Sequence, residues 1–216
     1  MTHSPLSERQ EEVEAPVFWK VFDRAVSVLR AAEVPFVLIG GIPSAAHGYP
    51  RWSHRTEDID LLVRPDDAES ALEALSDAGF ATERTEEDWI FKALMSGVLV
   101  DLIFRVGGSM ELDDEMVARV RVERFEDRTI EMVGPEDLAV MLAATYEEGA
   151  PGRLKNFLGI LAHADLDWDY LLARAGARLR PRLLAFLIYA ASKDIMLPRR
   201  VIVRLLQEER LLEAAS

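Results

Sequence analysis

Two aspartates that alternate along a short apolar segment are the residues of this chain best placed to do chemistry. Asp58 and Asp60 stand in the run EDIDLLV at 57–63, whose apolar and β-branched content predicts a short buried strand. Residues two apart on a strand share a face, so these carboxylates point the same way, roughly 7 Å apart at their Cα atoms. Such a pair repels and loses hydration unless a cation or a shared proton offsets the cost. A divalent metal is the simplest remedy, although a bare Asp-x-Asp is more often solvated at a strand end.

A third carboxylate strengthens the metal interpretation. Asp101 is the one charge in the apolar run VLVDLIF at 98–104, and lone acids are rarely buried without a partner. If the two strands are neighbours, the three carboxylates converge on one or two metal ions, as phosphoryl-type transfer requires. Oxygen ligands and the absence of cysteine favour magnesium or manganese over zinc. A hydrogen bond from a buried arginine, or a capping role, is the alternative for Asp101.

A glycine pair ahead of the aspartates suggests a phosphate site. The segment FVLI at 36–39 predicts a central strand, and Gly40 and Gly41 allow a turn with positive φ and with backbone amides open to a ligand. Pro43 suits the first turn of a short helix that Gly48 ends, so the helix N-terminus would face the turn and favour an anion. A Gly-Gly pair alone usually marks only a tight turn. The position of this pair, one strand and one helix before the aspartates, makes it a more specific indication of a phosphate site.

The order of these elements resembles the nucleotidyltransferase superfamily related to DNA polymerase beta. The strand, Gly-Gly turn and short helix precede HRTEDID at 54–60, which approximates an Arg-x-Thr-x-Asp-x-Asp motif, and a later strand aspartate follows. The chain is most similar to the abortive-infection type nucleotidyltransferases, many of them toxins of toxin–antitoxin pairs, and to small-molecule nucleotidyltransferases that inactivate antibiotics. The resemblance extends over roughly residues 34–160.

The resemblance implies an enzyme, dependent on magnesium or manganese, that transfers a nucleoside monophosphate from an NTP such as ATP to a hydroxyl and releases pyrophosphate. It implies that Asp58, Asp60 and Asp101 hold the metal, with Asp101 as the base for the attacking hydroxyl. The nucleotide-binding residues that it implies are Gly40, Gly41, Ser44, Arg55, Thr56 and Lys155. The acceptor is a tRNA end, a protein or a small hydroxylated molecule, and a toxin role would add an antitoxin as partner.

Two departures from the family pattern affect the basic contact to the nucleotide. Relatives commonly carry a lysine one turn after the segment that reads GPEDL at 134–138 here, where this chain has Met141 and Leu142. They also continue with arginine, lysine and aspartate where this chain reads RLKN at 153–156, whose lysine or arginine is the substitute. These departures motivate an alternative, a catalytically silent nucleotidyltransferase-fold protein that senses nucleotide or binds a partner. A phosphodiesterase would need more ligands, preferably histidines, than the motif offers.

Composition and charge limit the classes of protein. The chain has 216 residues, half of them hydrophobic, and a net charge of −13, which disfavours a tight grip on nucleic acid. The absence of cysteine excludes disulfides and fits a cytoplasmic location. The first ten residues lack the pattern of a signal peptide, and the longest apolar run, 183–191, is too short to cross a bilayer, so no membrane partner is expected.

The predicted fold class is α+β: a nucleotidyltransferase-fold mixed sheet with flanking helices, followed by a C-terminal helical lobe. The catalytic lobe, with an N-terminal helix, would occupy 1–133 and the helical lobe 134–216. The sheet lobe should contain helices at 7–33 and 65–78, a hairpin of 89–94 with 98–104 around Ser96-Gly97, and paired strands at 120–125 and 129–133. Helices in the second lobe are predicted at 135–148, 153–163, 167–175, 181–192 and 198–214.

Overall fold

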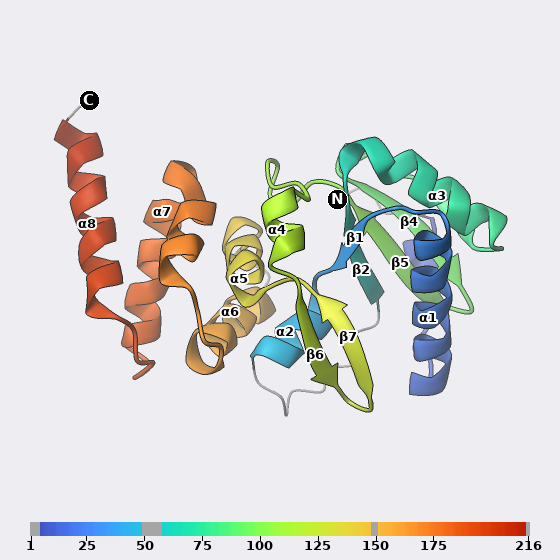
Figure 1. Ribbon diagram of the computed structural model, residues 1–216, viewed down its shortest axis with the longest axis horizontal. Helices are drawn as coiled ribbons and strands as arrows, with labels where there is room; N and C mark the ends of the chain where they lie inside the picture. Colours follow the sequence, from blue (N-terminus) through green and yellow to red (C-terminus); the bar gives the residue numbers. More distant parts are fainter. Residues whose placement is uncertain (1–4, 49–57, 148–150, 215–216) are drawn as a thin grey trace. The chain divides into compact units, whose positions relative to one another are not determined.

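The chain folds into two compact units. The computed structural model describes residues 5–48, 58–147 and 151–214. One unit is formed by Met1–Ile42 with Ser53–Val133, and the other by Pro43–Trp52 with Gly134–Ser216. The described part of the first unit contains a seven-stranded sheet with flanking helices, and that of the second is helical (Figure 1). The predicted mixed sheet followed by helices is therefore confirmed.

The sheet of the first unit is mixed, with strand order β3-β4-β5-β2-β1-β7-β6. Its strands are β1 Phe36–Leu38, β2 Asp58–Val63, β3 Ala81–Arg84, β4 Ile90–Met95, β5 Val98–Ile103, β6 Arg121–Phe125 and β7 Arg128–Met132. The pairs β2–β5 and β1–β7 are parallel, and the other neighbours are antiparallel. Every residue of β5 is buried, as expected for a nearly continuous apolar run in the interior of a sheet.

The hairpin of β4 and β5 forms around the predicted turn. Ser96 and Gly97 both have positive φ, 50° and 80°, which is the conformation of a two-residue turn that matches the twist of the strands. This turn fixes the antiparallel register, in which Met95 pairs with Val98. The hairpin prediction is confirmed, and with it the placement of Asp101 in the middle of a strand.

Helices α1 (Ala15–Ala31) and α3 (Ala68–Asp77) contact each other and the sheet, and so cover one of its faces (Figure 1). Each carries an apolar stripe that is buried, as the sequence pattern indicates. A 3-10 turn, η2 (Pro65–Asp67), leads into α3. Two short elements that the sequence analysis missed complete the unit, strand β3 and helix α4 (Asp114–Ala118). Helix α2 (Gly41–His47) begins in the first unit and continues into the second.

The predicted helix 7–33 is wrong at its start. Only a 3-10 turn, η1 (Ser7–Arg9), forms there, and α1 begins at Ala15 because Pro16, which lacks an amide hydrogen, suits the first turn of a helix and not its interior. The segment between them is held by the hairpin, since the Glu11 amide donates to the Gly97 carbonyl at 3.0 Å. Leu6 packs against apolar side chains of β4 and β5.

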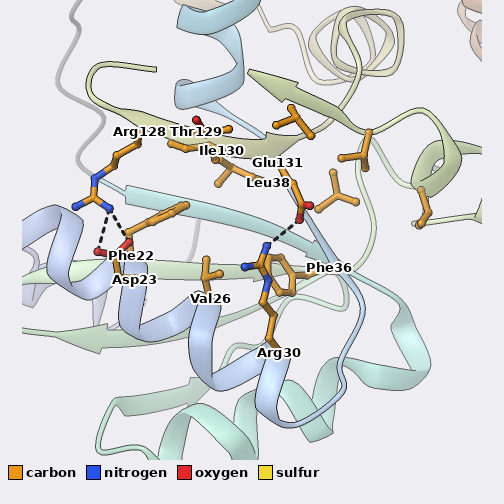
Figure 2. A pocket seen from close by; sticks show the side chains of 14 residues that line it. Phe22, Asp23, Val26, Arg30, Phe36, Leu38, Arg128, Thr129, Ile130 and Glu131 are labelled. Carbon is orange, nitrogen blue, oxygen red and sulfur yellow. Dashed lines mark hydrogen bonds and ion pairs between the residues drawn. The ribbon is translucent and has the colours of Figure 1, made fainter. Parts of the chain in front are cut away.

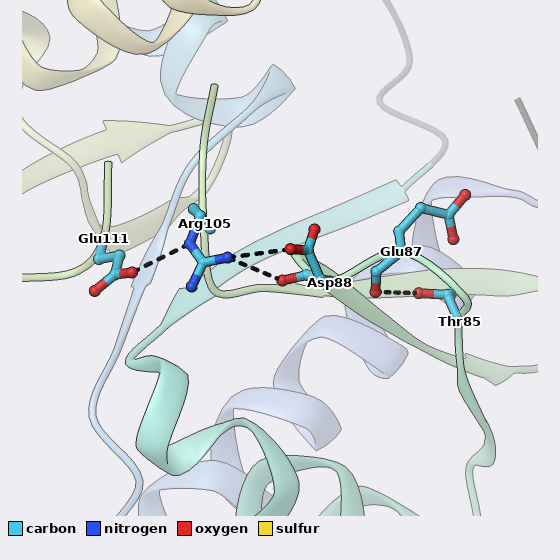
Figure 3. A network of polar contacts seen from close by, with 5 residues as sticks. All are labelled: Thr85, Glu87, Asp88, Arg105 and Glu111. Atoms are coloured by element: carbon cyan, nitrogen blue, oxygen red, sulfur yellow. Dashed lines mark hydrogen bonds and ion pairs between the residues drawn. The ribbon is translucent and has the colours of Figure 1, made fainter. Parts of the chain in front are cut away.

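A polar network ties the end of β5 to the loop that precedes β4 (Figure 3). Arg105 lies between two acids, 3.2 Å from Glu111 and 3.5 Å from Asp88. In the same loop the Thr85 hydroxyl donates to the carbonyls of Glu87 and Ile90. These contacts fix the start of β4 and the end of β5. Asp101 lies in the middle of β5.

The second unit consists of helices α5 (Pro135–Ala144), α6 (Pro151–His163), α7 (Trp168–Ala191) and α8 (Arg199–Ala214), together with most of α2. Helix α7 is interrupted at Gly176 (φ 57°, ψ 175°), a conformation that favours glycine. The interruption at Gly176 lies within the predicted break between 175 and 181, whereas the predicted helix start at Pro181 is wrong, because Pro181 lies inside the helix. None of the helices within the described residues is long and apolar enough to cross a membrane.

Candidate active site

The parallel pairing of β2 with β5 brings the three predicted aspartates together. In this register Asp58 lies opposite Leu99 and Asp60 opposite Asp101. Since Asp58 and Asp60 alternate along β2, their side chains share a face, and partners in register share it too. One carboxylate oxygen of each aspartate lies within 4.8 Å of the other two. The three acids therefore form a single cluster.

Burial and mutual repulsion act on this cluster. Asp101 is only 8% exposed, and Asp58 and Asp60 are partly buried. Burial raises the pKa of Asp60 well above its ordinary value, and the charges of Asp58 and Asp101 raise it further. Burial also raises the pKa of Asp101. Each of the three carboxylates raises the free energy needed to ionise the other two. A bound cation would lower that free energy.

Gly40 and Gly41 lie directly against the cluster. Gly40 has φ +77°, and a Cβ placed on it would come within 1.8 Å of an Asp60 side-chain oxygen. Only glycine fits there, for its backbone conformation and for space. The Gly41 amide donates a hydrogen bond to the Asp60 carboxylate, which lowers the pKa of that group. The glycine pair therefore shapes the position of Asp60, and its binding of a phosphate remains a prediction.

Lys92 is the functional candidate that the sequence analysis missed. It stands on β4 directly opposite Asp101, and its Nζ lies 2.9 Å from Asp101 Oδ1. Both side chains are largely buried, at 14% and 11% exposure. The charge of Lys92 lowers the pKa of Asp101 and that of Asp60, opposing the effect of burial. The predicted alternative for Asp101 was a hydrogen bond from a buried arginine; in the structure the donor is Lys92, and the other two carboxylates also lie beside Asp101. The sequence could have predicted this pair. Lys92 and Asp101 lie at equal distances from the Ser96-Gly97 turn, and such positions pair in a hairpin with a two-residue turn.

The remaining predicted site residues lie elsewhere in the chain. Arg55 and Thr56 fall outside the described residues. Ser44, on α2, is 4% exposed, and Lys155, on α6, is partly buried; both belong to the second unit. Their roles as nucleotide ligands remain predictions.

The chemistry of the donor set fits a hard divalent cation. The cluster offers carboxylate oxygens alone, which are the ligands that magnesium and manganese prefer. The three carboxylates lie close together with the Lys92 ammonium beside Asp101, and a divalent cation would offset the repulsion between them.

The cavity drawn in Figure 2 is a separate feature. It has a volume of about 510 Å³ and is lined by residues of α1, β1, β6, β7 and the end of α4. Two ion pairs cross it from α1 to β7: Asp23 with Arg128 at 2.7 Å, and Arg30 with Glu131 at 2.8 Å. Its remaining lining is mostly apolar.

Strand register places this cavity on the other face of the sheet from the carboxylates. Phe36 and Leu38, which line it, pair with Val63 and Leu61 of β2. Those two residues alternate with the aspartates of β2, so they point to the opposite face. The cavity under α1 is therefore not the candidate active site.

Comparison with solved structures finds chains to which this protein is similar. The crystal structure of ANT(2")-Ia in complex with adenylyl-2"-tobramycin matches with a TM-score of 0.51 and 13% identity, over 76% of this chain and 97% of that one. The lincosamide antibiotic adenylyltransferase LnuA, solved with lincomycin, matches with a TM-score of 0.47 and 16% identity, over 69% and 99% of the two chains. JHP933 from Helicobacter pylori matches with a TM-score of 0.45 and 14% identity, over 94% and 99%.

A comparison with curated proteins finds no match to this sequence. The sequence does match a protein-family model described as "Uncharacterised nucleotidyltransferase", over residues 9–193. That match includes all of the sheet and the three clustered aspartates. The α+β nucleotidyltransferase fold predicted from the sequence is thereby confirmed, and the chain belongs to this family of uncharacterised nucleotidyltransferases.

Proposed function

We propose that this protein transfers a nucleoside monophosphate from an NTP to a hydroxyl of a small molecule, in a reaction that depends on magnesium or manganese. The observation that carries the proposal is the convergence of Asp58, Asp60 and Asp101 to within 4.8 Å, in a chain of a nucleotidyltransferase family. Paired strand carboxylates suit the binding of a cation that faces a triphosphate.

Each residue of the cluster has a proposed role. Asp58 and Asp60 hold the cation, which when bound would polarise the α-phosphate and neutralise charge on the leaving group. Asp101 has one oxygen engaged by Lys92, so its other oxygen is the acceptor for the proton of the attacking hydroxyl. The hydroxyl oxygen then bonds to the α-phosphorus, the bond to the bridging oxygen breaks, and pyrophosphate leaves with that electron pair. Gly40 positions Asp60 by leaving room for its carboxylate.

The nucleotide contacts complete the proposal. Gly41, Ser44, Arg55, Thr56 and Lys155 are proposed to contact the NTP, as the superfamily resemblance implies. Lys155 takes this role because Met141 and Leu142, where relatives carry a lysine, are buried apolar side chains of α5.

A small, positively charged acceptor suits this chain better than a nucleic acid. The net charge of −13 attracts cations and repels phosphate backbones. ANT(2")-Ia, which shares the fold, was solved with adenylyl-2"-tobramycin, and tobramycin is a polycation rich in hydroxyl groups. A tRNA end or a protein acceptor, with the toxin role and antitoxin partner that would accompany it, is the competing assignment.

Label transfer tests the reaction and the acceptor together. The purified full chain is incubated with magnesium and each α-phosphate-labelled NTP, with aminoglycosides in one arm, total tRNA in a second and a protein extract in a third. We expect label to move to an aminoglycoside, and expect none with Asp58→Ala. The matched control is Asp66→Asn, which removes an exposed acid from η2 and should keep full activity.

The other outcomes decide between the competing assignments. Label on tRNA or protein, lost with Asp58→Ala, would keep the transferase and replace the acceptor. Binding of NTP without transfer to any arm would favour a catalytically silent, nucleotide-sensing protein. Absence of both NTP binding and transfer would contradict the proposal.

A further inference from the structure

The cavity under α1 has walls that side-chain contacts hold in place (Figure 2). Voids larger than a water molecule are few in protein interiors, whereas this cavity, at about 510 Å³, has the volume of a small-molecule site. Trp19 of α1 fixes the wall formed by the β6–β7 hairpin. Its indole donates to Glu126 Oε2 at 2.9 Å, and its ring contacts the ring of Phe125 edge-on. The cavity therefore does not depend on a ligand to form.

The lining of the cavity combines an apolar middle with charged ends. Asp23 and Arg30 are seven residues apart, about 10 Å along α1, and each forms an ion pair with β7. The apolar side chain of Val26 lies between them (Figure 2). Val117 and Val122, which also line the cavity, are 42% and 63% exposed although both are apolar. A ligand with an apolar body would remove these surfaces from water, which favours binding.

Arg30 is the residue best placed to recognise a charge on such a ligand. Its contact with Glu131 uses one guanidinium nitrogen, Nη2, of a group that has five N–H donors. Both side chains are about 60% exposed, so a ligand can replace Glu131 at little cost and leave it hydrated. Arg128, in contrast, donates to both oxygens of Asp23 and lies 4.8 Å from the centre of the Trp19 ring. Arg30 therefore has the greater capacity to bind a carboxylate.

We infer that the cavity under α1 is a second ligand site, which takes a small molecule with an apolar body and one carboxylate. The body would lie against Val26, and the carboxylate would accept hydrogen bonds from Arg30. The net charge of −13 repels anions at long range, but salt at physiological concentration screens charges beyond about 8 Å, so the adjacent guanidinium decides. The competing interpretation is a solvated groove whose ion pairs only attach α1 to the sheet.

This site is independent of the reaction proposed above. The cavity lies on the face of the sheet opposite to the three aspartates, so a ligand in it would not contact them. The label-transfer experiment therefore tests the proposed function alone, and the binding experiment below tests the second site alone.

Calorimetric titration of the full chain with three probes that share one apolar body tests the inference. The probes are cinnamate, cinnamyl alcohol and cinnamylamine, which are anionic, neutral and cationic at neutral pH. We expect one cinnamate per chain, bound about ten-fold more tightly than the alcohol, because a hydrogen bond between charged groups adds affinity. Equal or tighter binding of the alcohol or the amine, or no binding of any probe, would overturn the inference.

Variants on α1 locate the bound cinnamate. Val26→Trp fills the cavity and should abolish binding of cinnamate and of the alcohol. Arg30→Met should weaken cinnamate about ten-fold and change the affinity for the alcohol by less than about three-fold. The matched control is Arg24→Met, which removes the same charge from an exposed side chain of α1 that contacts the Ala78 carbonyl, and it should keep the wild-type affinity.

Two results with these variants would contradict the site. Unchanged cinnamate binding by Val26→Trp would place the ligand elsewhere, and equal affinities of Arg30→Met and Arg24→Met would exclude recognition by Arg30. If Val26→Trp does not fold, the comparison of Arg30→Met with Arg24→Met decides the location, and the ranking of the three probes by the wild type decides the class of ligand.

Discussion

Each unit of the protein buries acidic side chains, and the two sets differ in how their charge is balanced. In the helical unit Asp137 is fully buried and accepts hydrogen bonds from the Tyr170 hydroxyl at 2.8 Å and from Arg174 Nε at 2.6 Å. Its neighbour Glu136, 1% exposed, accepts from the Asp167 amide at 2.8 Å. In the sheet unit three aspartates converge, with one lysine beside them.

The difference separates a structural acid from the acids that we propose to be functional. Asp137 has a partner on each oxygen, so its burial joins α5 to α7 and needs nothing further. In the cluster, burial and the neighbouring carboxylates raise the pKa of Asp60. Burial alone therefore does not indicate a site, whereas the convergence of several acids supports one.

The largest expected effect comes from breaking the cluster. Asp60→Asn should lower kcat/KM by about a thousand-fold or more, since it removes a proposed cation ligand from the transition state. The same change should raise the thermal midpoint of the metal-free protein, because it removes a repelling charge. Steady-state kinetics and thermal melts in EDTA measure the two effects. Full activity, or a lower metal-free midpoint, would contradict the functional assignment.

Asp137 should respond in the opposite way. Asp137→Asn should lower the free energy of unfolding by about 3 kcal/mol, because Arg174 loses the carboxylate that neutralises it in a largely buried position. Denaturant titration measures the change. Asp169→Asn, which removes an exposed partner of Arg204, is the control and should have a much smaller effect. An unfolding free energy equal to that of the control would show that Asp137 has no structural role.

Gly40→Ala should destabilise the protein more than Gly108→Ala does. Both glycines have positive φ, at +77° and +82°, but only the new Cβ at Gly40 would collide with Asp60. We therefore expect the Gly40 variant to be less stable than the Gly108 variant by about 2 kcal/mol. Denaturant titrations of both variants isolate the collision from the backbone strain that they share. Equal losses would contradict the close approach of Gly40 to the carboxylate.

The smallest effect is a pH dependence that distinguishes the cluster from ordinary surface acids. The pKa of Asp60 is raised above its ordinary 3.8. At a pH between these two values, Asp60 holds a proton in the folded protein and has lost it in the unfolded chain. The stability of the metal-free protein should therefore fall as pH rises above 3.8, by at most about 1.4 kcal/mol per pH unit for each such proton. Asp60→Asn should flatten this dependence, and Asp66→Asn should not. Parallel curves for the wild type and Asp60→Asn would argue against the raised pKa.

Much of the candidate site was accessible from local sequence patterns. The alternation of Asp58 and Asp60, the apolar run around Asp101 and the turn at Ser96-Gly97 all predicted strand positions that the structure confirms. Lys92 was accessible as well, because a two-residue turn pairs positions equidistant from it. Strand β3 was missed because its sequence, ATER, is short and largely polar.

The sequence by itself determined which residues carry negative charge, most of the segments that become strands, and the turn at Ser96-Gly97. These follow from side-chain periodicity and backbone sterics, which act over a few residues. Only the tertiary structure decided that β2 lies parallel to β5, that Asp60 therefore adjoins Asp101, and that Asp137 is paired with Arg174. Strand order and side-chain pairing join segments distant in the chain, so they depend on how the whole sheet and the helices pack.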